Sequence, residues 1–210
     1  MIRVRGVEKS FGDKTVLHGI DAEFHAGQVN FIIGRSGSGK SVLTKCIVGL
    51  LEVDAGRVQY DDVVFSDLDR KEREAVRRRI GMLFQGGALF DSMTVLENVE
   101  FPLRMFNDMT AEERRERAME CLKRVELDGA EDRFPAEVSG GMQKRVALAR
   151  AIVGRPQYLF CDEPNSGLDP QTAIVIDNLI KDLTTEYSTT TVVISHDMNS
   201  VIEIGDNIHF

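Results

Sequence analysis

A glycine-rich octapeptide in the first quarter of the chain has residue types that can hold phosphate groups. It reads Gly34-Arg35-Ser36-Gly37-Ser38-Gly39-Lys40-Ser41 and fits the P-loop pattern. Glycines let successive backbone amides turn toward one concavity, and a helix that begins there directs its positive dipole end to the same place. In this pattern the lysine reaches the β- and γ-phosphates and the serine hydroxyl binds Mg²⁺. The segment therefore predicts a nucleotide site that uses Mg²⁺.

The residue after this loop departs from the common form of the pattern. Position 42 is Val, where many such loops carry a hydroxyl that bonds the α-phosphate. One hydrogen bond contributes about 0.5–1.5 kcal/mol, so Val42 is expected to weaken nucleotide binding without abolishing it.

The segments around the loop have the patterns of the elements that position it. Residues 29–33 form a short apolar run bounded by Gly27 and Gly34, which is typical of a buried strand. Residues 41–51 carry apolar side chains at helical spacing, so we expect a helix directly after the loop. A buried strand, a glycine-rich turn and a helix form the order that a P-loop requires.

Strand patterns lie on both sides of a mostly helical middle region. Thr110 and Glu113 form a capping box, which predicts a helix that ends at about residue 125. Further helices are expected over 140–153 and 171–187. The expected strands are an edge strand at 2–8, a hairpin of 57–60 and 63–65 around Asp61-Asp62, and buried strands at 80–84, 158–161 and 191–194.

This order predicts an α/β fold with a mostly parallel sheet, an antiparallel β patch near the N-terminus and a helical subdomain. Residues 1–85 and 156–210 would form the core of one domain, and residues 86–155 the helical subdomain. Residues 207–210 read as a strand that has just begun, so we expect the C-terminus to be truncated.

Composition limits the classes of function. The chain has 210 residues, 42% hydrophobic and 29% charged, with a net charge of −8 that argues against a general nucleic-acid binder. The basic residues of 70–79 have glutamates interspersed among them, as on a solvated helix face. The chain has no run of eighteen apolar residues and no secretory signal, and its three scattered cysteines are typical of reduced thiols. We therefore expect a cytoplasmic protein.

Four short segments complete the pattern of residues that could do chemistry. Gln85 follows the strand at 80–84, and two acids end the apolar strand at 158–161. Alone, such a pair of acids could be a solvated strand end, and a single histidine could be an ordinary surface or core residue. The segments are Ser139-Gly140-Gly141, Asp162-Glu163, Ser166-Gly167-Leu168-Asp169 and Ser195-His196-Asp197.

In this order and spacing the motifs resemble those of the ATP-binding cassette (ABC) ATPases, over nearly the full chain. The resemblance implies a P-loop NTPase (RecA-like) core that binds and hydrolyses ATP with Mg²⁺. It implies that Asp162, Ser41 and Gln85 bind the metal, that Glu163 is the general base and that His196 contacts the γ-phosphate. Phe11 would stack on adenine, although a phenylalanine taken alone is usually a core residue.

The resemblance also implies a second copy of the chain. Ser139, Gly140 and Gly141 open a helix, and in this family they grip ATP held by the other subunit of a head-to-tail dimer. Asp169 would lie at that junction. Two residues depart from the common pattern, Met142 where Gln is usual and Asn165 where many members have Thr. Neither departure removes a phosphate donor.

Two details narrow the resemblance to the ATPase subunits of phospholipid-trafficking (Mla-type, Mce-associated) transporters. These are Ser-Gly-Gly-Met-x-Lys-Arg from Ser139 and the segment Leu83–Phe90. The expected partners are an integral-membrane permease of the inner membrane and a periplasmic lipid-binding protein. Ala88, Leu89 and Phe90 would line the groove for the permease, or alternatively belong to the subdomain core.

Two other functions compete with transport. Some relatives regulate cell-wall remodelling at division and move no solute; the membrane protein that co-purifies would discriminate this reading. DNA-repair and ribosome-associated ABC ATPases carry coiled-coil or zinc insertions or two cassettes, and this chain has none of these.

Overall fold

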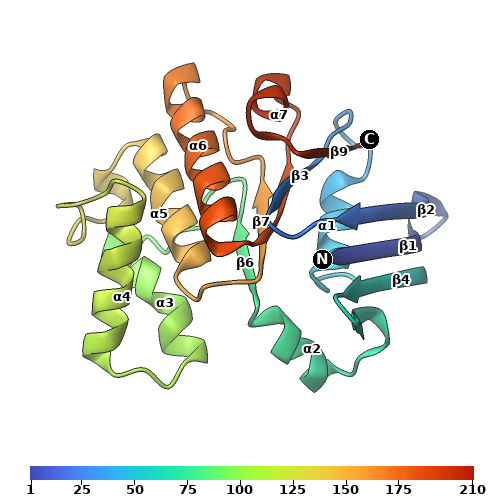
Figure 1. Ribbon diagram of the computed structural model, residues 1–210, viewed down its shortest axis with the longest axis horizontal. Helices are drawn as coiled ribbons and strands as arrows, with labels where there is room; N and C mark the ends of the chain where they lie inside the picture. The colour runs from blue at the N-terminus through green and yellow to red at the C-terminus, as the bar shows by residue number, and fades with distance from the viewer.

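Two β-sheets and a group of helices make up the computed structural model, which describes residues 1–210 (Figure 1). The strands are β1 (Ile2–Phe11), β2 (Lys14–Phe24), β3 (Gln28–Ile32), β4 (Ala55–Tyr60), β5 (Val63–Val64), β6 (Ile80–Leu83), β7 (Tyr158–Asp162), β8 (Thr190–Ile194) and β9 (Asn207–His209). The helices are α1 (Lys40–Ile47), α2 (Arg70–Arg77), α3 (Val95–Phe106), α4 (Ala111–Arg124), α5 (Gly140–Ile152), α6 (Pro170–Tyr187) and α7 (Met198–Ile204). Short 3-10 turns lie at Phe65–Asp67 and Pro135–Glu137.

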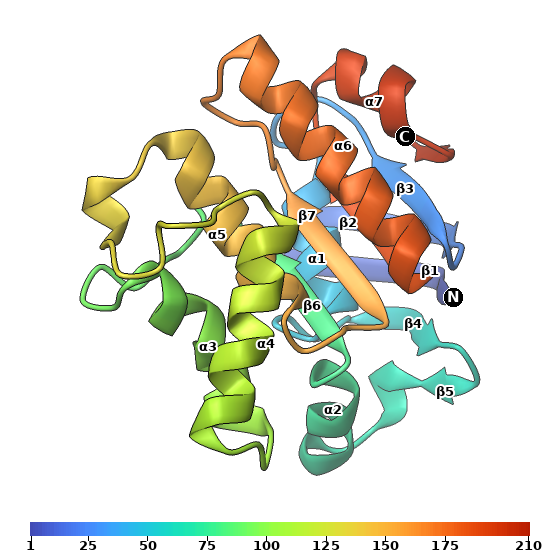
Figure 2. The ribbon, with the colours of Figure 1, turned by 60° about the vertical axis from the view of Figure 1, so that its left-hand side comes forward.

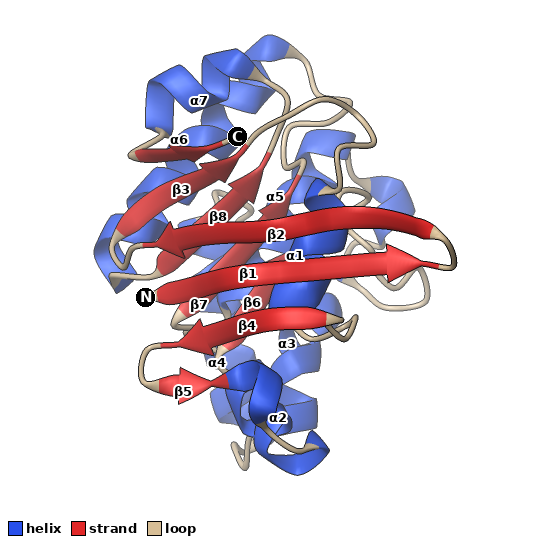
Figure 3. Cartoon of the chain, turned by 90° about the vertical axis from the view of Figure 1, so that its right-hand side faces the viewer, coloured by secondary structure: helices blue, strands red, loops and turns tan.

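The smaller sheet is antiparallel and has the order β2-β1-β4-β5 (Figure 3). β1 is hydrogen-bonded on both sides, to β2 and to β4. The prediction of an edge strand at 2–8 is therefore wrong. Apolar and polar residues alternate in β1 because Ile2, Val4 and Val7 face the core while the other face of the strand meets solvent. Edge strands and interior strands of such a sheet share this pattern.

The larger sheet is parallel and has the order β6-β7-β8-β3-β9. Its strands pair in register, with Phe31 opposite Val193 and Cys161 opposite Val193 on the other side. Because the strands are parallel, their carboxyl ends meet at one edge. The P-loop, Gln85, Asp162-Glu163 and Ser195-His196 all follow or end these strands, so the topology brings them to that edge.

Helix α1 lies between the two sheets (Figure 3). Its Leu43, Cys46 and Ile47 belong to a cluster of 19 buried residues that includes Phe24 from the antiparallel sheet and Phe160 from the parallel one. This packing on both sides fixes the helix, and with it the loop at its N-terminus.

Helices α3, α4 and α5 pack together on the other side of the parallel sheet (Figure 2). The capping box predicted at Thr110 and Glu113 is present, since each side chain bonds the other residue's backbone N–H. The N–H of Thr110 bonds the Glu113 carboxylate and lowers its pKa. Val146, Leu148 and other α5 residues join one cluster of 30 buried residues with the strands, so these helices share the core of the sheet.

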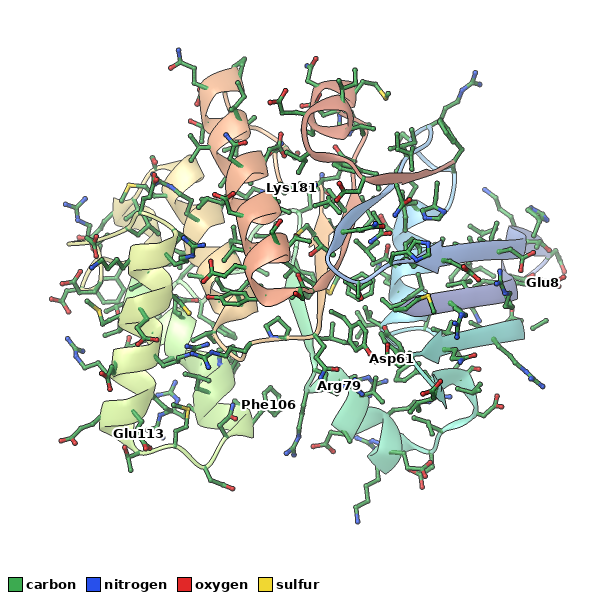
Figure 4. The ribbon with its side chains drawn as sticks, in the orientation of Figure 1. Glu8, Asp61, Arg79, Phe106, Glu113 and Lys181 are labelled. Atoms are coloured by element: carbon green, nitrogen blue, oxygen red, sulfur yellow. The ribbon has the colours of Figure 1, made fainter.

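Asp61, in the turn between β4 and β5, ties the antiparallel sheet to the parallel one (Figure 4). Its carboxylate accepts hydrogen bonds from the N-terminal ammonium at 2.7 Å, the Tyr158 hydroxyl at 2.5 Å and Arg79 at 3.3 Å. Tyr158 belongs to β7, so this contact fixes the relative position of the two sheets.

The three cysteines, Cys46, Cys121 and Cys161, are free and buried. Burial raises the pKa of the Cys121 thiol to about 11, so it carries no thiolate at neutral pH. None of the helices combines the length and the apolar character needed to cross a membrane.

Candidate nucleotide site

The P-loop has a backbone that only glycine adopts easily. Gly34, Gly37 and Gly39 have φ angles of 151°, 78° and 100°, all in the region that L-residues rarely adopt. A Cβ on Gly39 would also lie 3.0 Å from Leu17 Cδ2. The sequence thus specifies a tight turn from β3 into α1.

The N-terminus of α1 is open to an anion. No side chain caps this helix and its first turn has no acidic residue, whereas α2, α3 and α4 each have a capping box. Its first N–H groups therefore remain available, as phosphate binding requires. The Lys40 ammonium donates to the carbonyls of Gly34 and Arg35, at 2.8 and 3.0 Å, and so lies along the loop.

One pocket of about 580 Å³ brings the predicted groups together. The P-loop forms one wall, and residues at the carboxyl ends of β6, β7 and β8 form the other. The predicted residues that line it are Gly34, Arg35, Ser36, Gly37, Gly39, Lys40, Ser41, Val42, Gln85, Asp162, Glu163 and His196. Ser38 belongs to the same loop but does not line this pocket.

Glu163 has an unusual backbone and a defined partner. Its φ of 48° is in the left-handed region, which is costly for a residue other than glycine. Its N–H donates to the carbonyl of Ile194 at 2.8 Å. Its Oε1 lies 2.8 Å from His196 Nδ1. An ionised carboxylate only accepts hydrogen bonds, so Nδ1 carries the hydrogen.

Asp162 is half-buried beside this pair. Burial raises the pKa of its carboxyl, the neighbouring Glu163 raises it further, and the ammonium groups of Lys45, Lys40 and Lys144 oppose both effects. Two adjacent carboxyl groups that disfavour each other's charge form a site that favours a divalent cation.

The side chains present fit ATP with Mg²⁺. Ser41, Gln85 and Asp162 line the same pocket and offer a hydroxyl, an amide and a carboxylate oxygen. No cluster of three or more His, Cys, Asp or Glu residues could hold a metal alone. This set suits Mg²⁺, which is usually held by one or two carboxylates together with substrate phosphates.

Besides Ser38, five predicted residues lie outside this pocket. Ser139 caps α5 by accepting from the N–H of Met142, so Gly140 and Gly141 form the first turn of that helix. Asp169 caps α6 and also accepts from the Thr172 hydroxyl. Phe11 is 48% exposed, which excludes the core alternative, and the Lys9 ammonium lies 5.7 Å from its ring centroid.

Comparison with known proteins decides the family. The family described as "ABC transporter" matches residues 17–166 of this chain. The chain belongs to the ABC transporter family. The predicted α/β fold, the ATPase class and the nucleotide, ATP, are thereby confirmed.

Several named relatives share this ABC cassette. The probable ribonucleotide transport ATP-binding protein mkl of Mycobacterium leprae is 40% identical over 99% of this chain and 60% of its own length. The methionine import ATP-binding protein MetN of Clostridium tetani is 39% identical over 99% of this chain and 65% of its own. The cassette thus spans about three fifths of these relatives.

Solved structures agree with the cassette fold along nearly the whole chain. The dimeric structure of MJ0796, a bacterial ABC transporter cassette, has a TM-score of 0.90 and 38% identity, covering 99% of this chain and 93% of that one. A second structure of the same protein is a dimer in a post-hydrolysis state bound to ADP and Pi.

Three further residues in or beside this ABC site were not predicted from the sequence. Val16, from β2, and Ile194, from β8, line the pocket. Lys45 lies one turn after Ser41 on α1 and lowers the pKa of Asp162. Lys45 could have been found from its spacing on the predicted helix, whereas Val16 lies on a strand that was not predicted.

Proposed function

We propose that this chain binds and hydrolyses ATP as the ATP-binding subunit of an ABC transporter. The observation that carries the proposal is the pocket that joins the open N-terminus of α1 to Asp162, Glu163 and His196. Relatives named as transport ATP-binding proteins support it.

Each group of the pocket has a separate role in the proposed hydrolysis. The first-turn N–H groups of α1 and the Lys40 ammonium bind the phosphates of ATP and offset their charge. Glu163 accepts a proton from the water that attacks the γ-phosphorus, and ADP leaves as the bond to the β,γ-bridging oxygen breaks. His196 holds the Glu163 carboxylate by its Nδ1–H. Mg²⁺, held by Ser41, Gln85 and Asp162, would neutralise charge on the phosphates.

We propose that a second copy completes the site with the predicted residues that lie outside the pocket. Ser139, Gly140 and Gly141 begin α5 at an exposed helix N-terminus, a second anion-binding end. The pair would be head-to-tail, so that this end and Asp169 meet the partner's ATP; the structures of the MJ0796 cassette, which are described as dimeric, support the formation of a pair.

ATP hydrolysis by the purified chain tests this function. We expect turnover per chain to rise with chain concentration, because each site needs two copies, and to vanish when EDTA removes Mg²⁺. A coupled-enzyme assay measures both. Turnover per chain that is independent of concentration would argue against shared sites, and no turnover at any concentration would refute the ATPase.

Val42→Thr is expected to tighten ATP binding about two- to tenfold, the value of one hydrogen bond of about 0.5–1.5 kcal/mol. Val42 is partly buried and lines the pocket, so the added hydroxyl lies at the site while the methyl group that remains still packs. Titration with a fluorescent ATP analogue measures the change. Val42→Ala is the matched control, since it removes packing and adds no hydroxyl. Equal affinity in Val42→Thr and the parent would contradict the prediction.

We also propose that a membrane permease docks in a groove of about 700 Å³ beside the helical subdomain, residues 86–155. Phe84, Ala88, Phe90 and Phe106 line it, whereas Leu89 packs against the buried core. Phe84, Phe90 and Phe106 are partly exposed, and the guanidinium of Arg78 lies 5.9 Å from the Phe106 ring centroid. An apolar groove with basic residues at its rim suits an amphipathic helix with acidic ends.

Phe106→Ala is expected to lower retention of the chain on washed native inner membranes by about tenfold or more, because a buried phenylalanine contributes about 1.5–3 kcal/mol. ATP hydrolysis by the isolated chain should stay within about twofold of the parent, since Phe106 lies outside the nucleotide pocket. Phe134→Ala, an exposed phenylalanine away from the groove, is the matched control. Equal loss in both variants would argue against docking at this groove.

The cargo is proposed to be a phospholipid, with the cassette at the cytoplasmic face of the inner membrane and a periplasmic lipid-binding protein in the complex. The motif from Ser139 and the segment Leu83–Phe90 support this. The relatives named above are described as transporting ribonucleotides or importing methionine. Purification of the native complex followed by mass spectrometry of its proteins and lipids tests it. A permease with a lipid-binding partner and enriched phospholipid supports the proposal, and a single-span regulator of hydrolases refutes it.

A further inference from the structure

A buried polar cluster lies behind the loop that carries Glu163. Asn165 Nδ2 donates to Asp177 Oδ1 at 2.8 Å and to Ser200 Oγ at 2.9 Å. Asp177 and Ser200 are only 4% and 2% exposed. The three side chains come from the loop after β7, from α6 and from α7. The cluster therefore joins three elements that are far apart in sequence.

The Asp177 carboxyl is in an environment that disfavours its charge. Burial raises its pKa, hydrogen bonds from Ser200 and Asn165 oppose that effect, and the facing carboxylates of Asp197 and Glu203 raise it further. A buried carboxyl gives little net stability, and an apolar residue of similar size could fill such a position. The Asn165 amide is a hydrogen-bond partner that this buried carboxyl has in the structure.

The cluster lies close in sequence to both reacting partners. Asn165 follows Glu163 by two residues, and Ser200 follows His196 by four at the start of α7. Glu163 holds a left-handed backbone with φ of 48°, which persists only when its surroundings fix it. The backbone bond to Ile194 fixes its N–H side. On the other side, its carbonyl accepts from the N–H of Ser166 at 3.2 Å and from the Lys144 ammonium at 3.5 Å. The Asn165 side chain, inside the same turn, ties it to α6 and α7.

We propose that Asp177 is a positioning residue: through Asn165 and Ser200 it holds the Glu163 loop and helix α7 in the arrangement that sets the contact between Glu163 and His196. The inference rests on the proposed ATPase function. It assigns to α6 a role in the reaction although no residue of that helix lines the nucleotide pocket.

Asp177→Leu, which keeps the volume and removes the acceptor, is expected to lower kcat for ATP by about 10²-fold, the cost of a displacement of about 1 Å at a reacting group. KM for ATP should change less than about threefold, because the P-loop is untouched. Asp177→Asn keeps an acceptor oxygen for Asn165 and should recover kcat to within about fivefold of the parent. Asp182→Asn, exposed on the same helix, is the matched control.

Asn165→Ala removes the least buried side chain of the cluster. It is the second variant, to be used if Asp177→Leu does not fold. It should lower kcat by at least about tenfold, and the double variant should be no worse than the lower single variant, because contacting residues act as one unit. Normal kcat in Asn165→Ala, or losses that multiply in the double variant, would overturn the proposal. A lower Tm with unchanged kcat would show that the cluster only stabilises the fold.

Crystal structures of the parent and Asn165→Ala give a readout that needs no hydrolysis. We expect Glu163 to leave the left-handed region, or the distance from its Oε1 to His196 Nδ1 to exceed the 3.5 Å limit of a hydrogen bond. An unchanged Glu163 would refute the positioning role while leaving the ATPase function in place. A parent chain without ATPase activity would refute that function, and the structures would still decide the geometry.

Discussion

Glu163→Gln is expected to lower ATP turnover by about 10²- to 10⁴-fold, the usual contribution of a general base. The amide has the same shape, so its oxygen can still accept the Nδ1–H of His196, now 2.8 Å from Oε1. It cannot take a proton from water. The substitution therefore removes one chemical step and keeps the geometry around it.

We expect Glu163→Gln to bind ATP as the parent does. The P-loop, with Lys40 and the open N-terminus of α1, is unaltered, so ATP should bind with the parent's affinity and hold two copies together. Size-exclusion chromatography with ATP and Mg²⁺ should show a stable dimer. Glu112→Gln, exposed on α4, is the matched control for the loss of one charge. Normal turnover in Glu163→Gln would show that another group is the base.

Gly81→Ala is expected to lower the free energy of unfolding by about 3 kcal/mol, the upper part of the range for overpacking a core. Gly81 lies in β6, where a Cβ would collide with the backbone carbonyl of Ala151 in α5 and lie 2.9 Å from Pro156 Cγ. Neither neighbour is a flexible side-chain end. The added methyl group must push α5 away from the sheet.

Denaturant unfolding measures this loss. Gly154→Ala is the control, because the added Cβ meets nothing within 4 Å and makes the same chemical change just beyond the end of α5. It should leave stability within about 0.5 kcal/mol of the parent. Equal effects of the two substitutions would show that backbone entropy, not the contact with Ala151, decides the outcome.

Local patterns predicted most of the parallel sheet and its helices, but not the antiparallel sheet. β3, β6, β7 and β8 are short apolar runs, which buried parallel strands require. β2 was missed because its alternation, clear from Ile20 to Phe24, is interrupted between Leu17 and Ile20, where the register with β1 shifts. The alternation in β1 shows which face is buried and gives no information on how many neighbours a strand has.

The residues of the nucleotide site could be predicted from the order of the motifs along the chain. The geometry of the site could not. Parallel strands bring their carboxyl ends together, so Asp162, Glu163 and His196 could be placed near the P-loop from sequence. The left-handed backbone of Glu163 and the bonds among Asn165, Asp177 and Ser200 depend on contacts between distant segments. No spacing rule predicts these contacts. Whether Ser139 meets a partner's ATP depends on a second molecule.

The burial of all three native thiols makes the chain suitable for spectroscopic labelling at introduced cysteines. A maleimide dye reacts with exposed thiolates, and Cys46, Cys121 and Cys161 offer none at the surface. A cysteine introduced at Arg115, exposed on α4, and another at Lys14, exposed on β2, would therefore carry a donor and an acceptor with no native cysteine removed. Energy transfer between them would report any change in the distance between α4 and β2 during ATP hydrolysis.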